Sequence, residues 1–280
     1  MTLDAALRDL RHADPRVRGE AAWALGQSAD TDRAPALSAL RAALKDDAGY
    51  VRYVAALCLA ELQDREAFAA LCDQVEDGHP LARQAAVIAL GRIGEPRAAE
   101  ALLRAMQDPS ADVRFQAVAS LAEVEGVRAA PTIREALLDH DPEVRASAAA
   151  ALGDIGDRGS CDALAMLLGD EAADARFEAA HALARFGDAR AAPALLTFID
   201  DREHALAALE ALTGLREERA RQAADKLLGR LWAPTLVKVR AAGLLRALGE
   251  ARGTEYLEKA ARSRREPVRG LAREILASPP

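Results

Sequence analysis

The chain alternates between two kinds of apolar segment that recur along most of its length. In the first kind a turn residue is followed by Val-Arg, then Ala-Ala and Ala-Leu-Gly, as in DPEVRASAAAALGDIG at 141–156. In the second kind, such as RAAEALLRAM at 97–106, apolar residues recur at i, i+3, i+4 and i+7. This spacing is typical of an amphipathic helix with one buried face. The pattern therefore predicts a repeating unit of helix, short turn and helix.

The turns carry the residues that start and stop helices. Prolines that suit the first turn of a helix stand at Pro15, Pro80 and Pro142. Glycines follow the Ala-Leu block, and we expect the helices to end at them: Gly91, Gly94, Gly153, Gly156 and Gly187.

The period of the unit is almost constant. The repeated arginines are Arg18, Arg52, Arg83, Arg114, Arg145 and Arg176, at intervals of 34, 31, 31, 31 and 31 residues. The pattern weakens later, where His204 and Ala205 replace Val-Arg, and Val239-Arg240 restores the pair out of register. We expect one repeat domain over 1–280, with regular repeats over about 14–200 and degenerate repeats with a C-terminal cap over about 201–280.

The unit D-P-x-V-R-x-x-A-A-x-A-L-G-x-I-G-D resembles the short bacterial HEAT-like repeat of phycobilin lyase-type proteins. The resemblance implies an all-α fold, a right-handed α-solenoid of about nine HEAT-like helix pairs. In such families the repeated arginine usually pairs with a turn aspartate of its own or a neighbouring repeat. Asp14 with Arg18, and Asp141 with Arg145, have the i, i+4 spacing that favours such pairs. The six repeated arginines are therefore interpreted as a structural ladder.

The same resemblance implies that the second helix of each pair, here called the B-helix, lines a concave groove. Aromatic residues are enriched at B-helix positions that the core pattern leaves free, although aromatics are only 4% of the chain. Such residues could anchor a partner, or they could fill gaps between adjacent B-helices. The candidate groove residues are Trp23, Tyr53, Leu57, Ile88, Phe115, Phe177 and His181.

Composition and charge narrow the function further. The 280 residues are 51% hydrophobic, which supports a folded core, and the scarcity of aromatics disfavours an all-β fold. The net charge of −7 makes nucleic acid an unlikely partner, although one basic cluster lies near the end. Its members are Lys259, Arg262, Arg264, Arg265, Arg269 and Arg273. The odd number of cysteines (Cys58, Cys72 and Cys161) suggests free thiols in a reducing compartment.

The chain carries no motif of a known catalytic or metal site. No histidine pair has helical metal-ligand spacing, no His-Glu dipeptide occurs, and no phosphate loop or nucleophile elbow is written in the sequence. No apolar run is long enough to span a bilayer, and no signal peptide is expected, so we predict a cytoplasmic protein. The leading hypothesis is a non-enzymatic scaffold or adaptor, without cofactor, that binds a protein or peptide in its groove. The alternatives are nucleic-acid binding through the basic cluster and bilin lyase or chaperone-like activity.

Overall fold

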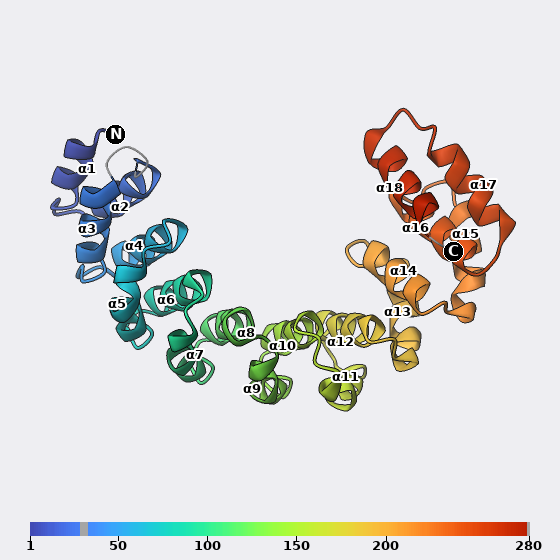
Figure 1. Ribbon diagram of the computed structural model, residues 1–280, viewed down its shortest axis with the longest axis horizontal. Helices are drawn as coiled ribbons and strands as arrows, with labels where there is room; N and C mark the ends of the chain where they lie inside the picture. The colour runs from blue at the N-terminus through green and yellow to red at the C-terminus, as the bar shows by residue number, and fades with distance from the viewer. Residues whose placement is uncertain (29–32, 279–280) are drawn as a thin grey trace. The chain divides into compact units, whose positions relative to one another are not determined.

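A computed structural model describes residues 1–28 and 33–278 of the chain (Figure 1). Within this part the secondary structure is helical throughout, with no strand. This confirms the expected all-α architecture of helix pairs. The chain divides into two compact units, Met1–Ala151 and Leu152–Pro280, and the boundary falls inside one helix. A single domain over 1–280 stays a prediction.

The first unit contains the helices whose repeats are most regular. They are α1 (Leu3–Asp9), α2 (Pro15–Ser28), α3 (Arg33–Ala43), α4 (Gly49–Glu61), α5 (Phe68–Gln74), α6 (Pro80–Ile93), α7 (Ala99–Ala105), α8 (Ala111–Glu125), α9 (Ala130–Ala136) and most of α10 (Pro142–Asp154). Short 3-10 helices precede α5, α7 and α9: η1 (Arg65–Ala67), η2 (Pro96–Ala98) and η3 (Gly126–Ala129).

The second unit continues the same order of elements. Its helices are the end of α10, then α11 (Cys161–Leu167), α12 (Ala173–Arg185), α13 (Ala192–Thr197), α14 (Ala205–Gly214), α15 (Arg221–Gly229), α16 (Thr235–Ala247), α17 (Ala251–Ala260) and α18 (Glu266–Ala277). The 3-10 helices here are η4 (Arg158–Ser160), η5 (Ala189–Ala191) and η6 (Glu218–Ala220).

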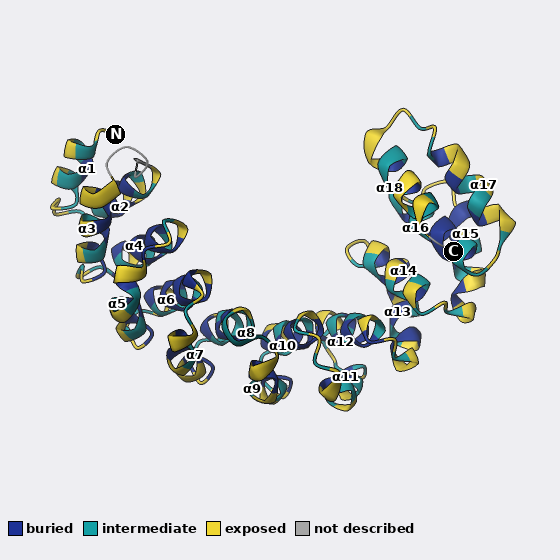
Figure 2. Cartoon of the chain, viewed as in Figure 1, coloured by how far each residue is buried: buried dark blue, intermediate teal, exposed yellow. Residues whose placement is uncertain are grey.

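Each unit is built from two rows of helices. In the first unit α2, α4, α6 and α8 pack side by side as the inner row, and the shorter α3, α5 and α7 pack behind them (Figure 1). In the second unit α12, α14, α16 and α18 form the corresponding row. The buried residues lie between the rows and between neighbouring B-helices (Figure 2), and most are Ala, Leu and Val. The small alanines allow the B-helix backbones to approach closely.

The core obeys a register that can be counted from the valine of each Val-Arg pair, here called the motif position. After Val144, the buried residues four, five and eight positions later are Ala148, Ala149 and Leu152. The same count from His204 reaches Ala208, Leu209 and Leu212, which are fully buried. His204 therefore occupies the motif position of repeat seven, as expected.

The register of repeat eight differs from the sequence expectation. Ala241, Ala242 and Leu245 are buried, and counting back places the motif position at Val237, followed by Lys238. The assignment of Val239-Arg240 is therefore wrong by two residues. Gly249 supports this register, because it has φ of +81° twelve residues after Val237, as Gly156 has φ of +77° twelve residues after Val144.

The glycines of the motif have two separate roles. Gly94, Gly156 and Gly187 have positive φ and end their helices, as expected. Gly91 and Gly153 do not end theirs, because α6 continues to Ile93 and α10 to Asp154. Instead they permit close packing: a Cβ on Gly91 would lie 2.5 Å from the Ser120 hydroxyl of α8. That hydroxyl donates to the Val87 carbonyl at 3.1 Å, which ties α8 to α6.

Candidate protein-binding surface

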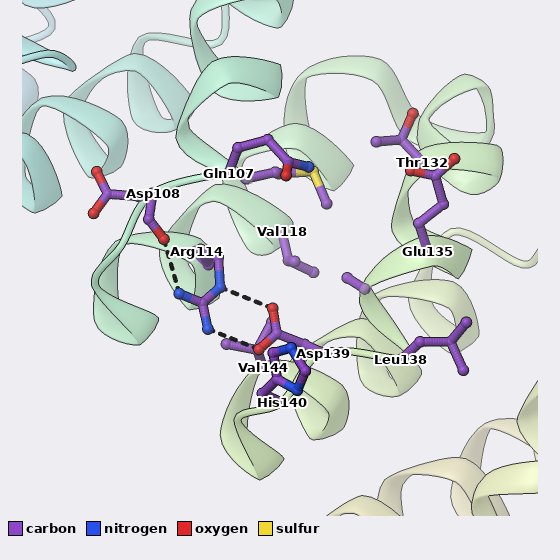
Figure 3. Close-up of a pocket in the computed structure, with 12 residues that line it drawn as sticks. Gln107, Asp108, Arg114, Val118, Thr132, Glu135, Leu138, Asp139, His140 and Val144 are labelled. Atoms are coloured by element: carbon purple, nitrogen blue, oxygen red, sulfur yellow. Dashed lines mark hydrogen bonds and ion pairs between the residues drawn. The ribbon is translucent and has the colours of Figure 1, made fainter.

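The repeated arginines cross from one repeat to the next. Arg114 on α8 donates Nε to Asp139 Oδ2 at 2.8 Å and Nη2 to Asp139 Oδ1 at 2.7 Å (Figure 3). Both side chains are largely buried, at 17% and 14% exposure. Bidentate pairs of this kind fix distance and orientation together. The same pair of bonds joins Arg18 to Asp46, Arg52 to Asp77, and Arg83 to Asp108.

Each ladder arginine also holds the turn that begins its own helix. Nη1 of Arg114 donates to the Asp108 carbonyl at 2.8 Å, six residues earlier. Asp108 in turn accepts from the Ser110 amide at 2.8 Å and from the Arg83 side chain. One aspartate therefore connects a turn, its own repeat and the preceding repeat, so the ladder positions the B-helices relative to one another.

The pairing within one repeat that the i, i+4 spacing suggested is wrong for Arg18. Asp14 accepts instead from Arg16, while Arg18 reaches Asp46 of the following repeat. The reason is geometric: stacking brings the next turn to the guanidinium, whereas Asp14 is engaged in its own turn. Arg145 donates to the Asp139 and His140 carbonyls, again like the other ladder arginines.

The ladder changes at the start of repeat seven. Arg176 donates to the Asp170 and Glu171 carbonyls, but among the described residues it has no ion pair, because Ile199 stands five residues before His204, where the ladder aspartate would be. Asp201 instead accepts from the His204 amide at 2.9 Å and from His204 Nδ1 at 2.8 Å. Since Ala205 follows His204, this repeat supplies no guanidinium to the next turn.

Five of the seven candidate groove residues lie on the inner row of the first unit. Trp23 is 55% exposed on α2. The other four are partly exposed, on α4, α6 and α8: Tyr53, Leu57, Ile88 and Phe115. These side chains leave apolar surface available along neighbouring helices.

Tyr50 belongs to this surface and was missed by the sequence reasoning. It is 47% exposed and stacks against Tyr53, with ring centroids 6.5 Å apart. Its ring lies against Gly19 of α2, where an added Cβ would collide with the edge of the ring. The equivalent position holds an aromatic ring in three other repeats, and the absence of a side chain at Gly19 is the sequence signal that could have revealed this contact. Trp23, Tyr50 and Tyr53, here called the aromatic patch, thus lie on two adjacent helices.

A row of ion pairs runs ten residues after the motif positions. Arg92 of α6 pairs with Glu61 of α4, and in the second unit Arg185 pairs with Asp154. All four side chains are substantially exposed. Exposed pairs of this kind contribute little stability, so this row supplies a polar border to the B-helix surface.

Phe177 is not an exposed anchor. It is only 4% exposed, because Phe198 and His204 cover it with ring centroids 5.2 and 4.2 Å away. Packing between repeats is thus the interpretation that holds for this residue. His181 stacks on Phe177 at 5.7 Å and is partly buried. Burial, reinforced by Arg185, lowers the pKa of His181 below its usual value of about 6.5, so its titration does not fall where the sequence suggested.

The cysteines and the other polar residues singled out in the sequence do not form a common site among the described residues. The three cysteines are free, and burial raises the pKa of Cys58 to about 11, which keeps this thiol protonated.

Within residues 1–28 and 33–278, no group of three metal-ligating side chains is arranged to hold an ion. In the same part of the chain no helix is long and apolar enough to cross a lipid bilayer. In the basic cluster, Arg269 donates to the Ser263 carbonyl as a ladder arginine does, whereas the other five side chains are exposed.

Comparison with solved structures finds the same fold in several proteins. The Escherichia coli protein YibA has a TM-score of 0.70 at 18% identity, over 90% of this chain and 93% of that one. The complex of CpcE and CpcF of phycocyanin lyase from Nostoc sp. PCC7120 gives 0.53 at 23% identity, over 89% and 95%. Importin beta gives 0.60 at 14% identity, over 98% of this chain and 46% of that one. At these identities the likeness concerns the fold alone. No curated protein sequence gives a significant match.

Family models agree with the repeat register. The model for HEAT repeats matches residues 37–122, 100–184 and 130–213, which together cover more than half of the chain. The model for the PBS lyase HEAT-like repeat matches residues 17–46. With its stacked helix pairs and arginine ladder, the chain belongs to the HEAT repeat family.

Proposed function

We propose that the protein is a non-enzymatic scaffold that binds a protein or peptide partner through the inner helix row of its first unit. The observation that carries this proposal is the aromatic patch. The chain has only 5 Phe, 2 Trp and 3 Tyr, yet three of these large rings lie exposed or partly exposed on α2 and α4.

The energetic argument is that these rings are not buried in the core. A ring that serves the core is buried, as Phe177 is, but Trp23 keeps 55% of its surface in water. Tyr and Trp are enriched among the residues that dominate binding energy at interfaces. The adjacent partly exposed Leu57, Ile88 and Phe115 extend the apolar surface along the row, and extended surfaces of this kind are what stacked repeats use for binding.

The test is affinity purification from the source cells with three forms of the full chain. These are the natural sequence, a triple variant with Trp23→Ala, Tyr50→Ala and Tyr53→Ala, and a control with Leu138→Ala. Leu138 is 77% exposed but lies in the turn before α10, outside the inner row. A partner that is retained by the natural and control chains and lost by the folded triple variant supports the proposal. A partner retained equally by all three contradicts it.

A second candidate function is nucleic-acid binding through the basic cluster. The observation in its favour is that Lys259, Arg262, Arg264, Arg265 and Arg273 are exposed and form no ion pair among the described residues. Binding of a fluorescent oligonucleotide whose affinity falls steeply with salt, and falls further with Arg264→Glu, would identify it. A bilin lyase or chaperone-like role is tested separately, by the absorbance change of a free bilin on mixing.

A further inference from the structure

Between repeats seven and eight the ladder lacks both its arginine and its aspartate, and a cavity lies there. Every ladder aspartate with a bidentate arginine stands five residues before a motif position, as Asp139 does before Val144. Five residues before Val237 the chain has Trp232. The arginine of the preceding repeat is likewise replaced, by Ala205. A buried ion pair is thus exchanged for an alanine and a tryptophan.

The exchange leaves an apolar hollow of about 580 Å³ in the second unit. Its floor is formed by Ile199, Leu227 and Val237, which are 8%, 3% and 8% exposed. Cavities of roughly 300–1,000 Å³ are the usual size of ligand pockets. The equivalent hollow in the first unit, about 360 Å³, contains the Arg114–Asp139 ion pair in its wall (Figure 3).

Two large apolar side chains stand in water at the rim of this hollow. Trp232 is 96% exposed and Leu231 is 90% exposed, in the loop between α15 and α16. Exposing apolar surface of this size to water is unfavourable, and burying it on binding would be favourable. An exposed apolar pair beside an apolar hollow is typical of a surface that binds another protein segment.

Four charged residues line the rim of the hollow. Asp200 is paired with Arg230 at 2.5 Å. Asp201 accepts hydrogen bonds from two backbone amides and from His204, so its carboxylate already has partners in its own turn. Arg202 also lines the hollow, and among the described residues its side chain has no ion pair or hydrogen bond. Arg202 is therefore the charged side chain of the lining that is available to pair with an incoming carboxylate.

We propose that this hollow binds a peptide segment of a partner that carries large apolar side chains next to a carboxylate. The apolar side chains enter between Trp232 and the floor, and the carboxylate pairs with Arg202. A second copy of the chain, which would insert its own Leu231 and Trp232, is the alternative occupant that the experiment below distinguishes. This site lies in the second unit and is separate from the aromatic patch.

The test uses Trp232 itself as the reporter. The chain has two tryptophans, so Trp23→Phe leaves Trp232 as the sole indole. The probes are synthetic twelve-residue peptides with two leucines spaced three apart and with Glu, Ser or Lys as flanking residues. Because indole emission moves to shorter wavelength when it leaves water, we expect a saturable shift with the Glu-flanked peptide. Binding of the Lys-flanked peptide should be at least tenfold weaker.

Matched variants separate the two parts of the site. Arg202→Glu should invert the preference between Glu- and Lys-flanked peptides, whereas Arg264→Glu, an exposed arginine outside the hollow, should not. Trp232→Ala should weaken binding of a fluorescein-labelled peptide at least tenfold, and Leu206→Ala, 38% exposed on α14, should leave it unchanged. Circular dichroism of each variant checks that it is folded.

Three results would overturn the proposal. One is the absence of binding by every peptide up to about 1 mM. Another is an affinity that is the same for Glu and Lys flanks or indifferent to Arg202→Glu. The third is a concentration-dependent dimer in analytical ultracentrifugation that Trp232→Ala abolishes, because the hollow would then hold a second copy.

Discussion

Arg114 and Asp139 form a bidentate ion pair between consecutive repeats, although 25 residues separate them in the chain. The same guanidinium also donates to the carbonyl of Asp108, at the start of its own helix. The pair is thus both a link between repeats and part of a turn. Its loss should lower the free energy of unfolding of the first unit.

Arg114→Met should lower the free energy of unfolding by about 2–4 kcal/mol. The substitution leaves the largely buried Asp139 carboxylate without its partner, and breaking a buried pair costs more than the pair contributes. The control is Arg97→Met, whose partner is Glu95 but whose side chain is 74% exposed, so its cost should stay within about 1 kcal/mol. Urea unfolding measures both, and equal losses would show that the ladder has no special role.

Asp139→Asn should make the stability less dependent on acid pH. The hydrogen bonds from Arg114 hold the pKa of Asp139 below its ordinary value, against the opposing effect of burial. In the unfolded chain the pKa is about 3.9, so the folded state binds fewer protons. The stabilisation is therefore complete above about pH 5 and is lost as the pH falls through 4 toward the lowered folded pKa. Urea unfolding at several pH values gives the free energy of unfolding, which should fall more steeply with decreasing pH in this window for the natural chain than for the variant. The same pH dependence in both chains would contradict the assignment.

Gly91→Ala and Gly214→Ala should act in opposite directions. At Gly91 a Cβ would lie 2.5 Å from the hydroxyl of Ser120 and 3.1 Å from its Cα, so overpacking should cost about 1–3 kcal/mol. At Gly214, the last residue of α14, no atom lies within 4 Å of the added Cβ apart from the neighbouring residues and backbone of its own helix. Alanine should stabilise that site by up to about 1 kcal/mol, through its higher helix propensity. Thermal unfolding checks the signs, and destabilisation by both would refute the close-approach argument.

Phe177→Ala and Trp23→Ala should separate packing from binding. Phe177 is buried among Phe198 and His204, so its truncation should cost about 3–5 kcal/mol of stability. Trp23→Ala should change the melting temperature little and weaken partner binding by about 1–3 kcal/mol. The comparison requires calorimetry and, once a partner is identified, titration. A large stability loss at Trp23 with unchanged affinity would assign the aromatic patch to the core.

Backbone amides from Asp201 onward should exchange with solvent faster than those of α6 and α8. Stability in repeat proteins is approximately a sum of repeat and neighbour contributions. His204 and Ala205 replace the motif pair, so repeat seven has no guanidinium to join it to the turn at Trp232. Hydrogen exchange followed by mass spectrometry gives the protection of each helix, and uniform protection along the chain would rule out this weak point.

The sequence alone was sufficient for the repeat, the helix pairs and the core. The 31-residue interval and the apolar spacing can be counted directly, because each repeat buries the same few positions against its neighbours. The structural role of the arginines also followed, and so did the motif position at His204. The sequence did not predict which aspartate forms the ion pair with each ladder arginine. Asp14 is four residues from Arg18, but stacking of the next repeat brings Asp46 to the guanidinium instead.

Exposure was decided only by the tertiary structure. Trp23 and Phe177 belong to the same set of B-helix positions in the sequence, yet one remains in water while Phe198 and His204 cover the other. Trp232 had no signal in the repeat pattern, because the register of repeat eight was clear only from the burial of Ala241, Ala242 and Leu245. Periodicity determines which face of a helix is apolar, but side chains from other helices determine whether that face is covered. Those contacts lie far apart in the chain, and only folding brings them together.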